Sequence, residues 1–174
     1  MTYSEIEKKA FEILEKYDGM PVGEKNYEID VIRLTQAFGI QVHKRKLGGE
    51  ISGLLVIKDG RASIGLESEQ GKERMRFTIA HELGHYILHR NLKSTFVDEV
   101  FARSGTSSQL EREANVFAAS LLMPKELLIN AIEHRGWSRI GDDQIAELAK
   151  LFNVSGVSMT YRLVNLKIIE QPYV

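Results

Sequence analysis

The segment His81-Glu82-Leu83-Gly84-His85 constrains the fold of this chain more than any other feature. Residues four apart in an α-helix lie about 40° apart on one face. The spacing therefore predicts two imidazoles one turn apart on a single helix, with Glu82 about 100° further round. Two histidines that can bind one metal ion, with a carboxylate beside them, form the first half of a zinc hydrolase site.

The residues around this motif predict a buried helix. Apolar side chains occupy both flanks of residues 77–89, and the one polar sector holds Thr78, His81, Glu82, His85 and His89. A helix that is apolar almost all round is normally buried. Ionisable groups on such a helix cost free energy unless they are paired or bind a metal. The context therefore favours a metal site over a chance pattern on a core helix.

A catalytic zinc usually takes three protein ligands, so a third ligand must come from elsewhere in the chain. No cysteine is available, and Leu88 and Asn91 stand where the extended metzincin motif requires glycine and histidine. A downstream carboxylate and His89 remain as candidates. Three histidines on successive turns span about 12 Å, which one ion does not readily bridge. His89 is therefore expected to act behind the ligands or to line the cleft.

A second helix is predicted over residues 109–123, and it carries two glutamates. Glu113 lies in the middle of an apolar stripe, whereas Glu111 lies about 160° away and is expected to face solvent. A glutamate on a core face needs a partner, and a zinc ion held by two histidines is a suitable one. Glu113 is therefore predicted to be the third ligand, with a buried ion pair to an arginine as the alternative.

The two helices together resemble a known family. FTIAHELGHYILH at residues 77–89, followed by EREANVFAASLLMP at residues 111–124, is similar to the gluzincin-like ImmA/IrrE metallo-endopeptidases. The resemblance implies that His81, His85 and Glu113 hold one Zn²⁺ and that Glu82 is the catalytic base. It also implies a protein substrate, a transcriptional repressor of the helix-turn-helix type, in mobile-element or stress regulation. Larger members carry a further sensor-like domain, so the shorter anti-repressor type is the closer likeness.

Length and composition fit one domain, residues 1–174, with an ordinary balance of 43% hydrophobic and 27% charged residues. The net charge of −1 gives no general attraction to nucleic acid or to anionic membranes. The absence of cysteine fits a reducing compartment. The charged, amphipathic start has no signal-peptide core, and no apolar run reaches the ~18 residues of a membrane span. A cytoplasmic protein is therefore expected.

The order of predicted elements indicates an α+β fold, a zincin-like minimal metallopeptidase with a small antiparallel sheet packed against a mostly helical body. Residues 1–70 are expected to form N-terminal helices and the sheet, 72–134 the zinc-site helices, and 142–167 a C-terminal helical hairpin. Asp59-Gly60 predicts a tight turn between strands at 54–58 and 61–66. The 61–66 strand is a candidate edge for pairing with substrate. The polar segment 91–108 is predicted to be a loop near the cleft.

The C-terminal segment supports a rival function, because residues 142–167 resemble a helix-turn-helix. The alternative is a non-enzymatic regulator that binds a repressor or DNA. A DNA-reading helix should carry several cations, and residues 155–166 offer only Arg162, so DNA binding is disfavoured. Beside His89, Tyr86 and Tyr161 are candidates for contacting substrate or supporting the metal ligands.

Overall fold

The computed structural model describes residues 1–21, 27–48, 50–99 and 108–170 and confirms the α+β class. Its helices are α1 (Tyr3–Lys16), α2 (Val31–Ala37), α3 (Lys72–His89), α4 (Gln109–Leu122), α5 (Lys125–His134), α6 (Asp142–Phe152) and α7 (Gly156–Asn165). Its strands are β1 (Gln41–Arg45), β2 (Ile51–Lys58), β3 (Arg61–Glu67) and β4 (Thr95–Glu99). β4 lies within the segment predicted to be a loop, and residues 100–107 of that segment lie outside the described residues.

The four strands form one sheet in the order β1-β3-β2-β4. β2 pairs antiparallel with β3 and β4, whereas β1 pairs parallel with β3, so the sheet is mixed rather than wholly antiparallel. The link from β1 to β2 passes over the end of β3, where the Glu67 carboxylate accepts the backbone N–H groups of Leu47 and Gly48 at 2.8 and 3.1 Å. β3 is therefore an inner strand, and the prediction that it forms an edge is wrong.

The turn between β2 and β3 is as predicted. Asp59 and Gly60 both have positive φ, 50° and 74°, as a two-residue hairpin turn of type I′ requires. Asp59 tolerates this backbone region better than most residues because its short polar side chain can bond locally. The Asp-Gly pair therefore fixes the register of the two strands that lie beneath α3.

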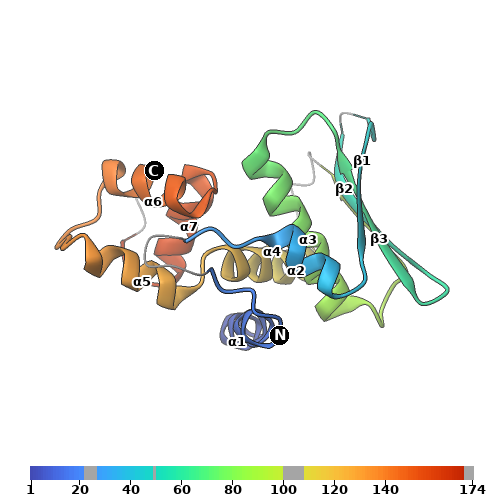
Figure 1. Cartoon of the computed structure of the whole chain (residues 1–174), viewed down its shortest axis with the longest axis horizontal. Helices are drawn as coiled ribbons and strands as arrows, with labels where there is room; N and C mark the ends of the chain where they lie inside the picture. Colours follow the sequence, from blue (N-terminus) through green and yellow to red (C-terminus); the bar gives the residue numbers. More distant parts are fainter. Residues whose placement is uncertain (22–26, 49, 100–107, 171–174) are drawn as a thin grey trace.

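α3 is the centre of the fold, with the sheet on one side and α4 on the other (Figure 1). Phe117 of α4 is fully buried and packs against α3 at Gly84. Gly84 permits this contact, because a Cβ at that position would lie 3.1 Å from Phe117 Cδ1 and 3.3 Å from Ala114 Cα. The glycine inside the histidine motif thus sets how closely the two site helices approach.

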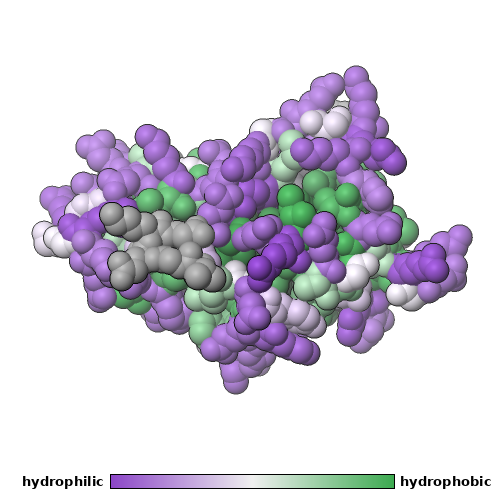
Figure 2. Space-filling view, viewed as in Figure 1, coloured by the Kyte–Doolittle hydropathy of each residue, from purple (hydrophilic) through white to green (hydrophobic). Residues whose placement is uncertain are grey.

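α1 packs along α4, α2 packs on α3, and the α6–α7 hairpin lies towards the far end from the sheet (Figure 1). Most of the face seen in Figure 2 is hydrophilic, and hydrophobic side chains reach the surface between the helical body and the sheet. Within the described ranges no single helix has the length and apolar character to cross a membrane. Only α4 and α5 taken together, bent by 42°, meet that measure.

Arg162 of α7 ties three helices together from a position that is 1% exposed. Its guanidinium donates to Met123 O at 2.9 Å, Ser120 Oγ at 3.3 Å and Glu7 Oε1 at 2.6 Å, and also contacts Tyr3 Oη. The only cationic side chain of α7 is therefore turned into the protein and cannot reach a phosphate.

Replacing Arg162 with leucine is expected to destabilise the protein by about 2–4 kcal/mol, because the Met123 carbonyl and the half-buried Glu7 carboxylate would lose their donor. Urea unfolding followed by circular dichroism measures this. The exposed Arg139→Leu is the control and should stay within about 0.5 kcal/mol. If Arg162→Leu lowers the free energy of unfolding by less than about 1 kcal/mol, the hydrogen bonds of Arg162 do not stabilise the fold.

Candidate metal centre

Helices α3 and α4 bring His81, His85 and Glu111 together. His81 Nε2 lies 3.1 Å from His85 Nε2 and 3.1 Å from Glu111 Oε2, and His85 Nε2 lies 3.3 Å from Glu111 Oε1. Among the described residues, these three offer ligand atoms that all lie within 4.8 Å of one another. Both histidines are buried, and the side chain of Glu111 is 28% exposed.

Glu113, the predicted third ligand, does not lie at this cluster. Its Oε2 lies 3.0 Å from His89 Nε2, and its Oε1 accepts from Gln109 Nε2 at 2.9 Å and contacts the ammonium group of Met1. The assignment of Glu113 as ligand therefore does not match the geometry, and neither does the expectation that Glu111 faces solvent.

Burial of a glutamate does not by itself identify it as a metal ligand. Glu113 is 7% exposed, as its place on the apolar stripe predicts, but a buried carboxylate can equally serve a group behind the ligands. A catalytic metal needs one position open to solvent and substrate, so a ligand at the border of the cleft suits it better. Glu111 occupies such a border position in the first turn of α4. The sequence contains one signal for it, since Glu111 and Asn115 repeat the four-residue spacing of His81 and His85.

Each histidine is oriented by a partner at Nδ1. His81 Nδ1 lies 3.0 Å from Asn115 Oδ1, so the imidazole donates its Nδ1 hydrogen to the amide oxygen and keeps a lone pair at Nε2. His85 Nδ1 lies 3.0 Å from His89 Nδ1, and its ring stacks on Phe96 of β4 with centroids 4.4 Å apart. Both Nε2 atoms thus point to the same place as the Glu111 carboxylate.

This arrangement fits a divalent metal ion. Tetrahedral ligands with bonds of about 2.0–2.1 Å lie about 3.3–3.4 Å apart, close to the separations of 3.1 to 3.3 Å found here. Two imidazole lone pairs and a carboxylate that face one another repel unless a cation or a proton lies between them. Burial, the largest single cause, would lower the pKa of His81, but the bond to Glu111 and the charges of Glu82, Asp98 and Glu111 together outweigh it and raise that pKa. The donor set of imidazole nitrogen and carboxylate oxygen is one that zinc accepts.

Glu82 lies beside the cluster with its carboxylate fully buried, and neither oxygen has a hydrogen-bond partner in the described part of the chain. Burial raises the pKa of Glu82 to about 8; His81 opposes this shift, while Asp98 and Glu111 add to it. Gly53 of β2 makes room for the carboxylate, because a Cβ there would lie 3.1 Å from Glu82 Oε1 and 2.3 Å from Thr78 Cγ2. Such an unpaired buried carboxyl is a strong indication of a functional group.

The metal-free protein is expected to lose stability between about pH 4.5 and pH 8. Over this range folded Glu82 keeps a proton that the unfolded chain has released, so the free energy of unfolding falls as pH rises. Urea unfolding in the presence of chelator, at several pH values, measures this against Glu82→Gln. The difference between the two proteins should widen up to about pH 8, and parallel curves would contradict the shifted pKa.

A polar cluster lies next to the centre. Arg74 of α3 donates to Ser52 Oγ at 2.7 Å and pairs with Asp98 of β4 at 3.6 Å. Burial raises the pKa of Asp98, partly opposed by the charge of His81, which shows that this carboxylate stands close to the centre. Sequence patterns gave no indication of this cluster, because it is assembled from three separate elements.

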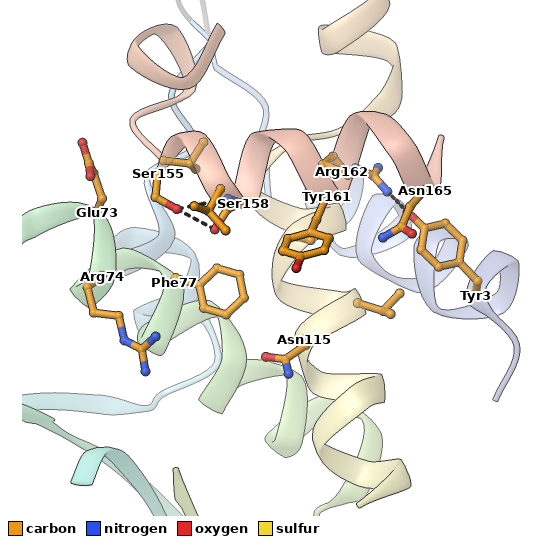
Figure 3. Close-up of a pocket in the computed structure, with 14 residues that line it drawn as sticks. Tyr3, Glu73, Arg74, Phe77, Asn115, Ser155, Ser158, Tyr161, Arg162 and Asn165 are labelled. Atoms are coloured by element: carbon orange, nitrogen blue, oxygen red, sulfur yellow. Dashed lines mark hydrogen bonds between the residues drawn. The ribbon is translucent and has the colours of Figure 1, made fainter. Parts of the chain in front are cut away.

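A groove of about 730 Å³ runs between α3, α4 and α7 beside the centre. Phe77, Asn115 and Tyr161 face one another across it from the three helices (Figure 3). Asn115 lines the groove and also contacts the metal centre, since its amide oxygen accepts from His81. Tyr161 is 65% exposed and forms part of the outer wall together with Val157, which is 68% exposed.

The other residues considered from the sequence lie as follows. His89 is buried directly behind His85. Tyr86 packs edge-on against Phe38 at 6.2 Å and lies under the guanidinium of Arg90, on the side of α3 that faces α2. Tyr161 lines the groove, so a substrate contact stays a prediction for Tyr161 and gains no support for Tyr86.

Comparison with known proteins supports the resemblance. A family model described as the IrrE N-terminal-like domain, a peptidase family, matches residues 35–164. Metallopeptidase ImmA of Bacillus subtilis is 29% identical over 116 residues, which are 66% of this chain and 64% of ImmA. The radiation response metalloproteases IrrE of Deinococcus radiodurans and Deinococcus deserti are 35% and 36% identical over 100 residues, 56% of this chain.

The chain spans just under two thirds of the length of ImmA and about a third of that of the IrrE proteins. A Mycobacterium tuberculosis transcriptional regulator shares the fold, with a TM-score of 0.61 and 17% identity over 97% of this chain and 48% of the regulator. The family match covers about three quarters of the sequence and includes both site helices. The chain therefore belongs to the ImmA/IrrE family of metallopeptidases, through its IrrE N-terminal-like domain.

Proposed function

We propose that this protein is a zinc-dependent endopeptidase in which His81, His85 and Glu111 hold the metal and Glu82 is the catalytic base. One observation carries the proposal: three converging ligand atoms lie beside a buried carboxylate whose oxygens have no partner in the described residues. Zinc retention alone needs no such base, so the pairing favours hydrolysis over a purely structural metal.

The chemistry follows from these groups. Zinc, when bound, lowers the pKa of water towards ~7 and polarises a carbonyl group. Glu82 takes a proton from the attacking water and passes it to the nitrogen of the leaving amine as the peptide bond breaks. Its raised pKa of about 8 in the metal-free protein suits a group that must both accept and release a proton near neutrality. Asn115 and Phe96 keep the two imidazoles in place during the reaction.

The substrate would lie in the groove beside the centre. Apolar side chains from α3, α4 and α7 line it, and Asn115 connects its wall to His81. β4 lies at the end of the sheet order, and its Phe96 stacks on His85. An extended polypeptide could pair with this strand and place a large apolar side chain in the groove. The substrate is therefore proposed to be a protein presenting an accessible extended segment.

The family suggests which protein that is. ImmA and IrrE are named a metallopeptidase and radiation response metalloproteases. By the family resemblance, the proposed substrate is a helix-turn-helix repressor in the cytoplasm, whose cleavage would relieve repression. The net charge of −1 agrees with a protein rather than a nucleic acid as partner.

The test is to incubate the zinc-loaded protein with a candidate repressor from the same genome and to measure intact masses. Two fragments whose masses add up to the repressor plus one water are expected. Chelator should abolish them, and zinc should restore them. Intact repressor in every sample, with several repressors and peptide libraries tried, would contradict the proposal.

The alternative of a DNA-binding regulator gains no support from α7. Its single cation, Arg162, is buried against Glu7, and the exposed residues of the helix include Val157 and Tyr161. A phosphate-contacting helix needs exposed cations. Binding to DNA that weakens with salt, without any proteolysis, is the result that would favour this alternative.

A further inference from the structure

We propose that His89 and Glu113 form a positioning pair that holds the imidazole of His85 in the orientation and tautomer required for metal binding. The inference rests on the proposed function only in that His85 is taken as a metal ligand. It gives a role to His89 of α3 and Glu113 of α4, which do not belong to the cluster of His81, His85 and Glu111.

The contacts form an unbroken line behind His85. His85 Nδ1 lies 3.0 Å from His89 Nδ1, and His89 Nε2 lies 3.0 Å from Glu113 Oε2. Both His89 and Glu113 are over nine-tenths buried, at 2% and 7% exposed. Buried ionisable groups cost free energy unless their hydrogen bonds are satisfied. The line therefore reflects a specific arrangement rather than loose packing.

The carboxylate at the far end determines where each hydrogen lies. The Glu113 carboxylate can only accept, so His89 Nε2 carries a hydrogen and donates it. A neutral His89 then has a lone pair at Nδ1, which accepts from the Nδ1 hydrogen of His85. His85 is left with a lone pair at Nε2, the atom that faces His81 and Glu111. The tautomer that metal binding needs is the one that this line selects.

The two ligand histidines use different partners. His81 donates to the neutral amide of Asn115, whereas His85 is linked through His89 to a carboxylate. A carboxylate behind a ligand imidazole fixes the ring and makes its free nitrogen a stronger donor. Phe96 also stacks on the face of the His85 ring, with centroids 4.4 Å apart, and restricts its tilt. We therefore expect the His89–Glu113 pair to contribute to metal affinity without touching the metal.

The test measures zinc affinity without any substrate, by competition with a chromophoric chelator. Glu113→Ala and His89→Ala should each weaken zinc binding by about 10–100-fold, the usual cost of losing a partner of a ligand histidine. Glu113→Gln should recover part of the affinity, because its amide oxygen can still accept from His89. Glu126→Ala removes a charge from an exposed position on α5 and should leave the affinity unchanged.

Two further readouts separate positioning from folding. Chelator-treated variants are compared by thermal unfolding, and ¹⁵N NMR of the imidazoles follows the Nδ1 hydrogen of His85 in the zinc-loaded protein. That hydrogen should be protected from exchange in the wild type and exchange faster in His89→Ala. If Glu113→Ala does not fold, Glu113→Gln and His89→Gln take its place.

Folded variants with wild-type zinc affinity and an equally protected Nδ1 hydrogen would overturn the inference. Because zinc is measured alone, this result is independent of whether any repressor is cleaved. A protein that binds zinc as described but hydrolyses nothing would contradict the proposed function and would not affect the inference about the positioning pair.

Discussion

Replacing Glu111 with alanine is expected to weaken zinc binding by more than about 100-fold, beyond the upper end of what loss of a partner behind a ligand costs. The carboxylate supplies one of three converging ligand groups, at 3.1 Å from His81 Nε2 and 3.3 Å from His85 Nε2. Without it two imidazoles alone would have to hold the ion. Zinc content after dialysis and the zinc dissociation constant by chelator competition measure the effect.

The informative comparison is with Glu113, two residues further along α4. Glu113→Ala removes the same charge from the same helix but should cost less zinc affinity than Glu111→Ala, because its carboxylate meets His89 instead of the ion. Glu111→Asp, with its shorter side chain, should bind zinc more weakly than the wild type but better than Glu111→Ala. A larger loss in Glu113→Ala than in Glu111→Ala would restore Glu113 as the third ligand.

The choice between these two glutamates shows where sequence reasoning stops. Periodicity predicts the site helices well: it indicates a helix over residues 109–123, and α4 is Gln109–Leu122. It also identified Glu113 as buried, which is right. Periodicity cannot tell which turn of α4 crosses which turn of α3, because that depends on contacts such as Gly84 against Ala114. Periodicity therefore favours Glu113 as the ligand, whereas the structure brings Glu111 to the two histidines.

Prediction of the sheet from the sequence meets the same limit. The Asp59-Gly60 turn gave the β2–β3 hairpin from local preferences alone. The parallel pairing of β1 with β3 depends on a link held by Glu67, and β4 forms in a polar segment in which Phe96 is buried. Neither follows from a residue pattern, since each depends on what a distant strand offers. The pairing of β4 with β2 brings Phe96 into the candidate site, where it stacks on His85.

Replacing Glu82 with glutamine is expected to lower kcat by about 10²–10⁴-fold while zinc affinity stays within a few fold of the wild type. Glutamine has nearly the same shape but cannot take a proton from water. Both oxygens of Glu82 lack a partner in the described residues, so the change breaks no hydrogen bond of the fold.

Stability supplies the control for this variant. Burial raises the pKa of Glu82 to about 8, so the charged form is disfavoured in the metal-free protein, and the neutral amide should leave that protein at least as stable near pH 8. A variant that is folded, binds zinc and no longer cleaves its substrate would assign the proton transfer to Glu82. Cleavage at the wild-type rate would instead exclude Glu82 as the base. Asp98, which pairs with Arg74 and whose pKa burial also raises, would then be the next carboxylate to replace.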